Sequence, residues 1–292
     1  MYELIQLTDR DFYIDCPAKI GIVDVGGGEV VLIDSGSDKD AGKKVLRILE
    51  TQGWKLRAIY NTHAHADHIG GNHVIQERTG CRIFARGLEC AYAGDPILEP
   101  AGLYGGLPFK ELRHKFLMAQ ESVVEPLTED ALPEGFRLLE LPGHSSDMTG
   151  FLTPDGTAYI GDCVSSAETL NKYGIGYLWD PARALATLEY VQTLEARRFV
   201  PAHAGVAEDI GELARLNIGA INAVKTRITG YCAEPVPFET LLKKIFDDYG
   251  LAMSAQQYVL IGSTVRSYLS AMYTEGILTY EFSDNRMLWK TV

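Results

Sequence analysis

The sequence predicts an α+β protein built as a four-layer αββα sandwich, in which two β-sheets pack between helices, followed by a small helical domain. Strand-like apolar runs alternate with amphipathic helical segments through about residue 207, and several of these runs lead into His or Asp side chains. Beyond Gly205 the pattern becomes helical. The 292 residues exceed the roughly 100–200 of a typical single domain, so we expect a larger domain over residues 1–207 and a smaller one over 208–292.

Composition narrows the functional class. The net charge of −12 argues against a protein that binds polyanions in general. The N-terminal stretch is acidic where a signal peptide would be basic, and no apolar run approaches the roughly 18 residues that a membrane span needs. We therefore expect a cytoplasmic protein without a membrane partner. Its cysteines show no paired spacing, as is usual for reduced thiols: Cys16, Cys81, Cys90, Cys163 and Cys232.

The first third of the chain predicts a hairpin, a helix and a buried strand. Residues 20–36 contain two apolar strands joined by a Gly-rich turn. Asp38 can cap a helix that runs to about Gln52, and residues 56–60 form the next strand. Asp34 ends the second strand of the hairpin. We expect it to form a turn or support a neighbouring side chain rather than bind a metal.

The stretch that follows, IYNTHAHADHIGGN over residues 59–72, holds four metal-capable side chains within six residues: His63, His65, Asp67 and His68. Imidazole and carboxylate ligands together suit zinc, iron or manganese, and the chain has no CxxC pair of a closed structural zinc site. A loop that curls around a point can turn all four side chains toward two neighbouring ions. A two-metal site is therefore the first hypothesis.

Two metals need further ligands, and the sequence offers three. His144 follows the strand-like run 136–141, Asp162 ends a hairpin predicted over residues 150–160, and His203 follows the strand-like run 198–201. A helix is expected from Pro181 to about residue 195, where Pro suits the first turn. Each candidate ligand thus lies at a strand end, as a site assembled from separate loops requires.

Two other segments bear on the substrate. Residues 86–120 form an insert rich in Gly, Pro and aromatic residues, which predicts either a lid over the site or a contact between two copies in a homodimer. Tyr173, Tyr177 and Trp179 follow Asp162 closely along the chain. They are candidates to bind substrate by walling a pocket, with ordinary packing as the alternative.

The order and context of these motifs resemble the metallo-β-lactamase-fold hydrolases, a superfamily that includes glyoxalase II, from residue 20 to residue 205. The resemblance implies the αββα sandwich and two divalent metal ions, zinc above all, with iron or manganese as alternatives. It also assigns the ligands: one ion to His63, His65 and His144, the other to Asp67, His68 and His203, with Asp162 bridging the two.

This ligand set implies hydrolysis of a small-molecule substrate. Two cations about 3.5–4 Å apart lower the pKa of a shared water toward roughly 7, and the resulting hydroxide can attack an ester-like bond such as a thioester or a lactone. Asp67 is the candidate catalytic residue, which could orient that water or take its proton. One alternative is a persulfide-type dioxygenase with a single iron, because the motif also resembles that branch. The other is a nucleic-acid phosphodiesterase or binding protein.

The C-terminal part bears on the nucleic-acid alternative. Helices are expected over residues 208–229, 238–249 and 263–273, with a hairpin over 276–292, an order that resembles the winged-helix domain appended to some of these hydrolases. From Tyr231 to Val292, five basic residues face seven acidic ones, a net charge of −2. Nucleic-acid binders need a clustered basic face, so we expect no nucleic-acid partner. Nor can the basic residues with which glyoxalase II contacts glutathione be matched here.

Overall fold

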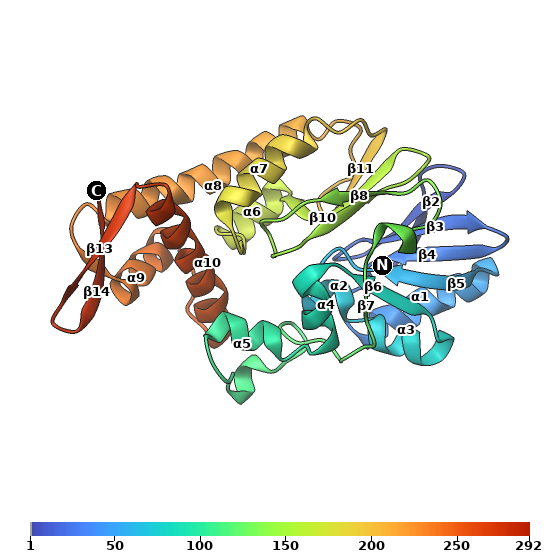
Figure 1. Cartoon of the computed structure of the whole chain (residues 1–292), viewed down its shortest axis with the longest axis horizontal. Helices are drawn as coiled ribbons and strands as arrows, with labels where there is room; N and C mark the ends of the chain where they lie inside the picture. The colour runs from blue at the N-terminus through green and yellow to red at the C-terminus, as the bar shows by residue number, and fades with distance from the viewer. Residues whose placement is uncertain (1) are drawn as a thin grey trace.

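The computed structural model describes residues 2–292, in which two β-sheets pack face to face and helices cover both outer faces (Figure 1). The apolar layer between the sheets draws side chains from both of them, such as Val31 and Tyr60 from one and Phe151 and Val200 from the other. This arrangement is the predicted αββα sandwich.

The first sheet has seven strands in sequence order. Its first four strands are antiparallel, and from the fourth onward the strands run parallel. The strands are β1 (Glu3–Gln6), β2 (Asp11–Asp15), β3 (Ile20–Gly26), β4 (Glu29–Ile33), β5 (Lys55–Tyr60), β6 (Arg82–Ala85) and β7 (Glu125–Pro126).

Helices α1 (Lys39–Gln52) and α3 (Asn72–Thr79) cover the outer face of this sheet (Figure 1). Asp38 caps α1 as predicted, because its carboxylate accepts hydrogen bonds from the Asp40 and Ala41 amides. Val45 of α1 is fully buried against the sheet. The short helix α2 (Ala66–Ile69) was predicted as a loop; four residues are too few to show a helical period.

The second sheet has four strands in the order β11-β10-β9-β8, with β10 and β11 parallel. They are β8 (Arg137–Glu140), β9 (Thr149–Leu152), β10 (Thr157–Ser165) and β11 (Arg198–His203). Helices α7 (Pro181–Val191) and α8 (Gly211–Tyr231) lie on its outer face (Figure 1). The helix predicted to reach residue 195 ends at Val191, because the chain turns so that the Arg197 amide meets Gly156 O at 2.8 Å.

The insert, residues 86–120, is largely helical. Its helices are α4 (Gly87–Gly94), α5 (Leu98–Tyr104) and the 3₁₀ turn Lys110–Leu112, and a second 3₁₀ turn follows at Glu129–Ala131. Leu103 and Leu112 pack against Val259 from the C-terminal part. The side chains of Leu103 and Leu112 therefore face another segment of the chain.

The C-terminal part adds the small sheet β12-β14-β13 and two helices to α8. The elements are β12 (Val236–Pro237), α9 (Phe238–Asp248), α10 (Ala255–Thr274), β13 (Leu278–Ser283) and β14 (Arg286–Thr291). Helix α10 begins at Ala255 instead of Ser263, because the Ser254 hydroxyl caps it by accepting from the Gln257 amide. One hydrophobic cluster joins Leu188 of α7 to Ile221 of α8 and Met272 of α10. The winged-helix assignment stays a prediction.

Helix α6 (Ala167–Tyr173) completes the helices. Within residues 2–292, no helix combines the length and the apolar character that crossing a membrane requires.

Gly71 allows a close approach that positions the predicted metal-binding motif. A Cβ atom at Gly71 would lie 2.3 Å from Ser35 O, well inside van der Waals contact. We predict that Gly71→Ala lowers the free energy of unfolding by about 1–3 kcal/mol, as overpacking does. Thermal and urea unfolding of metal-free protein measures it. Gly94→Ala is the matched control, since nothing lies within 4 Å of the added methyl, and an equal loss in both variants would contradict the steric argument.

Candidate metal centre

The centre lies where strand ends of the two sheets meet. Strand β5 runs parallel to its neighbours and its last three residues are buried. It ends at Tyr60, so the chain that follows emerges at the edge of the sandwich. His63 and His65 lie in this loop, and α2 then carries Asp67 and His68. The loop is tied to the second sheet because the Thr149 amide donates to Thr62 O at 2.9 Å.

The second sheet supplies the other three side chains. His144 lies between β8 and β9, and His203 is the last residue of β11. Asp162 was predicted at a strand end, but β10 continues to Ser165. The backbone at Gly161 has φ +51° and the register with β11 shifts there, so that a local irregularity carries Asp162 to the centre.

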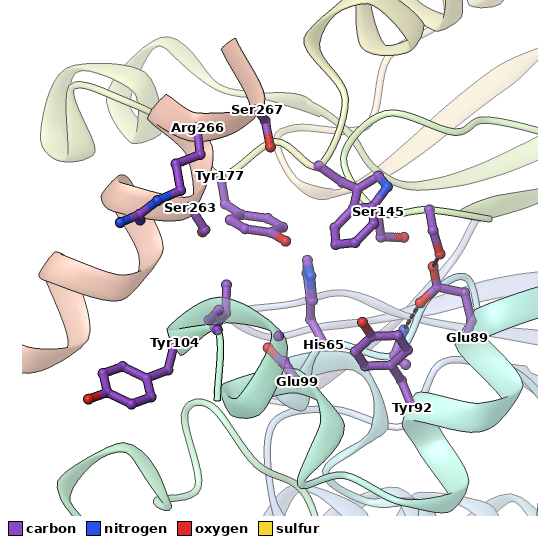
Figure 2. A pocket seen from close by; sticks show the side chains of 16 residues that line it. His65, Glu89, Tyr92, Glu99, Tyr104, Ser145, Tyr177, Ser263, Arg266 and Ser267 are labelled. Atoms are coloured by element: carbon purple, nitrogen blue, oxygen red, sulfur yellow. Dashed lines mark hydrogen bonds between the residues drawn. The ribbon is translucent and has the colours of Figure 1, made fainter. Parts of the chain in front are cut away.

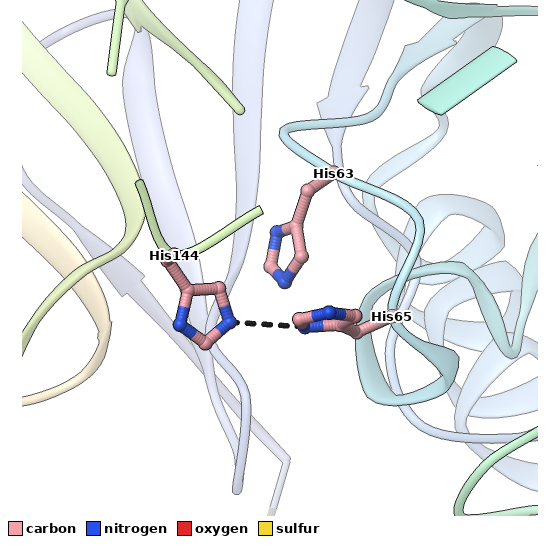
Figure 3. Close-up of side chains that lie close together, drawn as sticks. All are labelled: His63, His65 and His144. Carbon is pink, nitrogen blue, oxygen red and sulfur yellow. Dashed lines mark hydrogen bonds between the residues drawn. The ribbon is translucent and has the colours of Figure 1, made fainter. Parts of the chain in front are cut away.

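Atoms of the seven predicted residues lie within a few ångströms of one another. His65 Nδ1 is 2.9 Å from His144 Nε2, and Figure 3 shows these two rings beside His63. The Asp162 carboxylate lies 3.1 Å from His68 Nε2, 3.4 Å from His144 Nε2 and 3.3 Å from His203 Nε2. Asp162 thus contacts histidines on both sides of the centre.

Three groups of these side chains could each hold a metal ion. They are His63 with His65 and His144, Asp67 with His68 and His203, and His63 with His68 and Asp162. The first two groups match the two ligand sets that the resemblance implies.

Several of the inward atoms are buried without a hydrogen-bond partner among the described residues: His63 Nε2, His68 Nε2 and Asp162 Oδ1. Unpaired buried polar atoms are costly, and three in one place indicate that the site is built for something else to bind them. Imidazole nitrogen and carboxylate oxygen suit divalent zinc, iron or manganese. The donor set therefore fits a metal.

The outer nitrogens of three histidines are held so that Nε2 faces inward. His203 Nδ1 donates to Pro17 O at 2.8 Å, and His68 Nδ1 donates to Asp34 at 2.8 Å. The Thr62 hydroxyl has a single proton, which it gives to Asp34, so it accepts from His63 Nδ1 at 3.0 Å. Contacts of this kind fix the imidazole tautomer and orientation for metal binding.

Burial keeps one group of histidines neutral. It lowers the pKa of His63 below its usual value, and it lowers the pKa of His65 and of His144 to about 4. Neutral imidazole is the form that binds a metal.

The other group is dominated by carboxylates. Asp162 raises the pKa of His203 to about 10. Burial lowers the pKa of His68, but the charges of Asp162, Asp67 and Asp34 outweigh it and hold that pKa well above its usual value. Burial raises the pKa of Asp67 and of Asp162, and their histidine neighbours outweigh it, so both pKa values fall below the usual range. This side of the centre attracts positive charge.

A cavity of about 460 Å³ opens beside the centre and reaches from His65 to α10 (Figure 2). Tyr177 and Trp179 line it, as the sequence suggested, and the Tyr177 ring lies 5.1 Å from the His65 ring. Tyr173 does not line it; its side chain is 48% exposed at the end of α6. The tract that carries these aromatics turns after α6, which separates Tyr173 from the other two.

The insert supplies cavity residues that sequence reasoning missed, among them Glu89, Tyr92 and Glu99. Burial, with the nearby charges of Asp67 and Glu89, raises the pKa of Glu99 well above its usual value. No motif marks these residues. A carboxylate within an otherwise apolar helical segment is the only signal that could have drawn attention to Glu89.

The sequence model of the metallo-beta-lactamase superfamily matches residues 14–203. A hydroxyacylglutathione hydrolase of Rhodospirillum rubrum is 30% identical over 160 residues, which are 54% of this chain and 53% of that protein. The beta-lactamase-like protein 2 homolog of Drosophila melanogaster is 26% identical over 195 residues, 64% of this chain and 59% of its own. The chain thus spans about half the length of the curated relatives it matches.

Solved structures share the fold over nearly the whole chain. A metallo-beta-lactamase family protein from Thermus thermophilus has a TM-score of 0.73 at 17% identity, covering 99% of this chain and 97% of its own. A beta-lactamase domain protein from Burkholderia ambifaria has a TM-score of 0.74 at 16% identity, covering 99% and 94%. At such low identity these likenesses establish the fold alone.

The Asp34 carboxylate should matter for metal affinity, although it is not among the candidate ligands. In Asp34→Asn an NH₂ group replaces one carboxylate oxygen. This NH₂ group would face a hydrogen-bond donor of Thr62 or His68, so at least one of the three hydrogen bonds is lost. Asn suits the positive φ of 63° at this position. We predict a loss of about 10–100-fold in metal affinity, as is typical when a partner of a ligating histidine is changed.

Titration of metal-free protein against a chelator measures this affinity. Asp11→Asn is the matched control, because Asp11 is equally buried but hydrogen-bonds to Thr153, away from the ligands. Unchanged affinity in Asp34→Asn would show that Asp34 only stabilises the fold.

Proposed function

The chain belongs to the metallo-beta-lactamase superfamily, and we propose that it is a dinuclear metal-dependent hydrolase that cleaves an ester-like bond, a thioester or a lactone by preference. The observation that carries the proposal is the convergence of two ligand groups on the carboxylate of Asp162. Zinc takes about four ligands, so seven candidate ligands exceed what one zinc ion holds, and we propose two ions per chain with zinc as the preferred metal.

The candidate ligands divide into two groups, one for each proposed ion. His63, His65 and His144 would hold one ion and Asp67, His68 and His203 the other, with Asp162 in contact with both. Bound divalent cations supply Lewis-acid stabilisation of a developing oxyanion and acidify a water molecule. The chain contributes fixed histidine tautomers and a carboxylate-rich side that favours bound cations.

Asp67 is proposed to orient the attacking water. Its side chain is 45% exposed, and one carboxylate oxygen lies 3.2 Å from His203 Nε2, so it borders both the centre and solvent. A carboxyl whose pKa is held below the usual range is ionised at neutral pH and is a weak base. These properties favour orientation of the water over removal of its proton.

The choice of a thioester or lactone rests on the relatives and on the cavity. Several of the relatives are named as hydrolases of hydroxyacylglutathione, a thioester. The cavity has the volume of a small-molecule site, and Tyr92, Tyr177 and Trp179 give it an aromatic wall. Arg266 is the only Lys or Arg among its lining residues, which does not favour glutathione itself as the leaving group. We propose a small-molecule substrate and no nucleic-acid partner.

Elemental analysis of purified protein, together with a hydrolysis panel, tests this function. We expect close to two divalent ions per chain and turnover of thioesters or lactones in preference to phosphodiesters and a β-lactam. One iron per chain without hydrolysis would contradict the proposal and favour the mononuclear dioxygenase. Preferred cleavage of phosphodiesters would favour the nucleic-acid alternative.

Asp162→Ala removes the side chain that contacts histidines of both groups. We predict a loss of hydrolysis of more than about 100-fold, because even loss of a ligand's outer partner costs about 10–100-fold. Circular dichroism should show an intact fold. Asp155→Ala, in the turn before β10, removes a surface ion pair with Arg10 and should keep full turnover. Retained turnover and metal content in Asp162→Ala would assign Asp162 a structural role only.

A further inference from the structure

Glu89, on helix α4 of the insert, contacts two loops that carry metal ligands. Its side chain is buried, at 3% exposure, and its two carboxylate oxygens accept three hydrogen bonds. One oxygen accepts from the Ala64 amide at 2.9 Å. The other accepts from the Ser146 hydroxyl at 3.0 Å and from the Asp147 amide at 3.1 Å.

These partners lie beside the ligands. Ala64 stands between His63 and His65, and Ser146 follows His144 by two residues. The two loops come from different sheets, the first after β5 and the second after β8. One carboxylate therefore joins the loop of His63 and His65 to the loop of His144, whose rings meet at 2.9 Å between His65 Nδ1 and His144 Nε2.

The start of α4 is in turn fixed to the second loop. The Asp147 carboxylate accepts from the Leu88 amide at 2.9 Å, so Asp147 and α4 hydrogen-bond in both directions. Gly87 makes this approach feasible: its φ is +50°, and a Cβ atom there would lie 2.5 Å from Asp147 Oδ2. These contacts fix the position of α4 relative to the His144 loop, and they thereby fix the position of Glu89 relative to both loops.

We infer that Glu89 is a positioning residue that sets the spacing of His63, His65 and His144 for their metal ion. It acts through Ala64, Ser146 and Asp147 and does not itself belong to a ligand group. Helix α4 of the insert is thus part of the metal centre, in addition to covering the cavity. The inference rests on the metal centre of the proposed function, but not on which bond is hydrolysed.

A purely structural role for Glu89 makes a different prediction. The insert has a second attachment, where Leu103, Leu112 and Leu117 pack with Val259 of α10. If Glu89 only anchored the insert, its loss would resemble loss of that second attachment. Leu112, which is fully buried, provides the comparison.

Glu89→Gln is the test, because it keeps the size of the side chain while one acceptor oxygen becomes an N–H donor facing a donor of the loops. Metal-free protein is titrated with Co²⁺, and both affinity and the visible absorption spectrum are recorded. We expect an affinity loss of about 10–100-fold and a changed spectrum, as when the orientation of ligating histidines is lost. The same titration in a His203→Ala background disrupts the group of Asp67, His68 and His203 and so reports on the group of His63, His65 and His144.

Leu112→Ala should lower the melting temperature and leave Co²⁺ affinity and spectrum unchanged. If Glu89→Gln behaves like Leu112→Ala, the inference is overturned and Glu89 only anchors the insert. If Glu89→Gln does not fold, Ser146→Ala decides, since it removes one of the three hydrogen bonds and should weaken Co²⁺ binding by a smaller factor; an unchanged affinity there overturns the inference. Failure of the wild-type protein to bind Co²⁺ would instead overturn the metal centre itself.

Discussion

The structure depends on holding imidazole nitrogens and carboxylate oxygens close together at the edge of the sandwich. His65 and His144 approach to 2.9 Å, and Asp162 lies within 3.1–3.4 Å of three imidazole nitrogens. Each of these close pairs needs a proton or a cation between its lone pairs, and the charge of Asp162 favours a proton on His68 and His203. A flexible loop would relax by moving apart, so the scaffold must hold each ligand from outside.

The scaffold does this with close backbone approaches and with buried acceptors. Gly70 and Gly71 let the motif lie directly on the backbone of residues 35–38, where any side chain would overlap. The Asp34 carboxylate takes three hydrogen bonds from Thr62 and His68, so one side chain at the end of β4 holds two parts of the motif. The strands determine where the backbone of each candidate ligand lies, and these contacts determine the direction of its side chain.

The sequence predicted the parts of this centre that depend on local pattern. The candidate ligands lie in or just after apolar strand segments, and the structure brings all seven residues together. The sequence could not predict the role of Glu89 or of α4. The hydrogen-bond partners of Glu89 lie 25 and 57 residues away along the chain, and no periodicity encodes such contacts. The same holds for α10, whose first turn depends on a single capping hydroxyl at Ser254, and for Tyr173, which lies beside two cavity aromatics in sequence but apart from them in space.

In the proposed function, helix α4 of the insert couples the metal centre to the wall of the cavity, whereas α5 and α10 do not. The sandwich supplies the ligands, whereas α4, α5 and α10 supply much of the cavity wall. If these segments only covered the cavity, substitutions in them could alter substrate preference without affecting the metals. Because Glu89 hydrogen-bonds to both ligand loops, a substitution in α4 affects the metal centre as well as the cavity. The apolar contact with Val259 of α10 makes no such connection. Changes near α5 and α10 are therefore the ones that can reshape the cavity without weakening the metal centre.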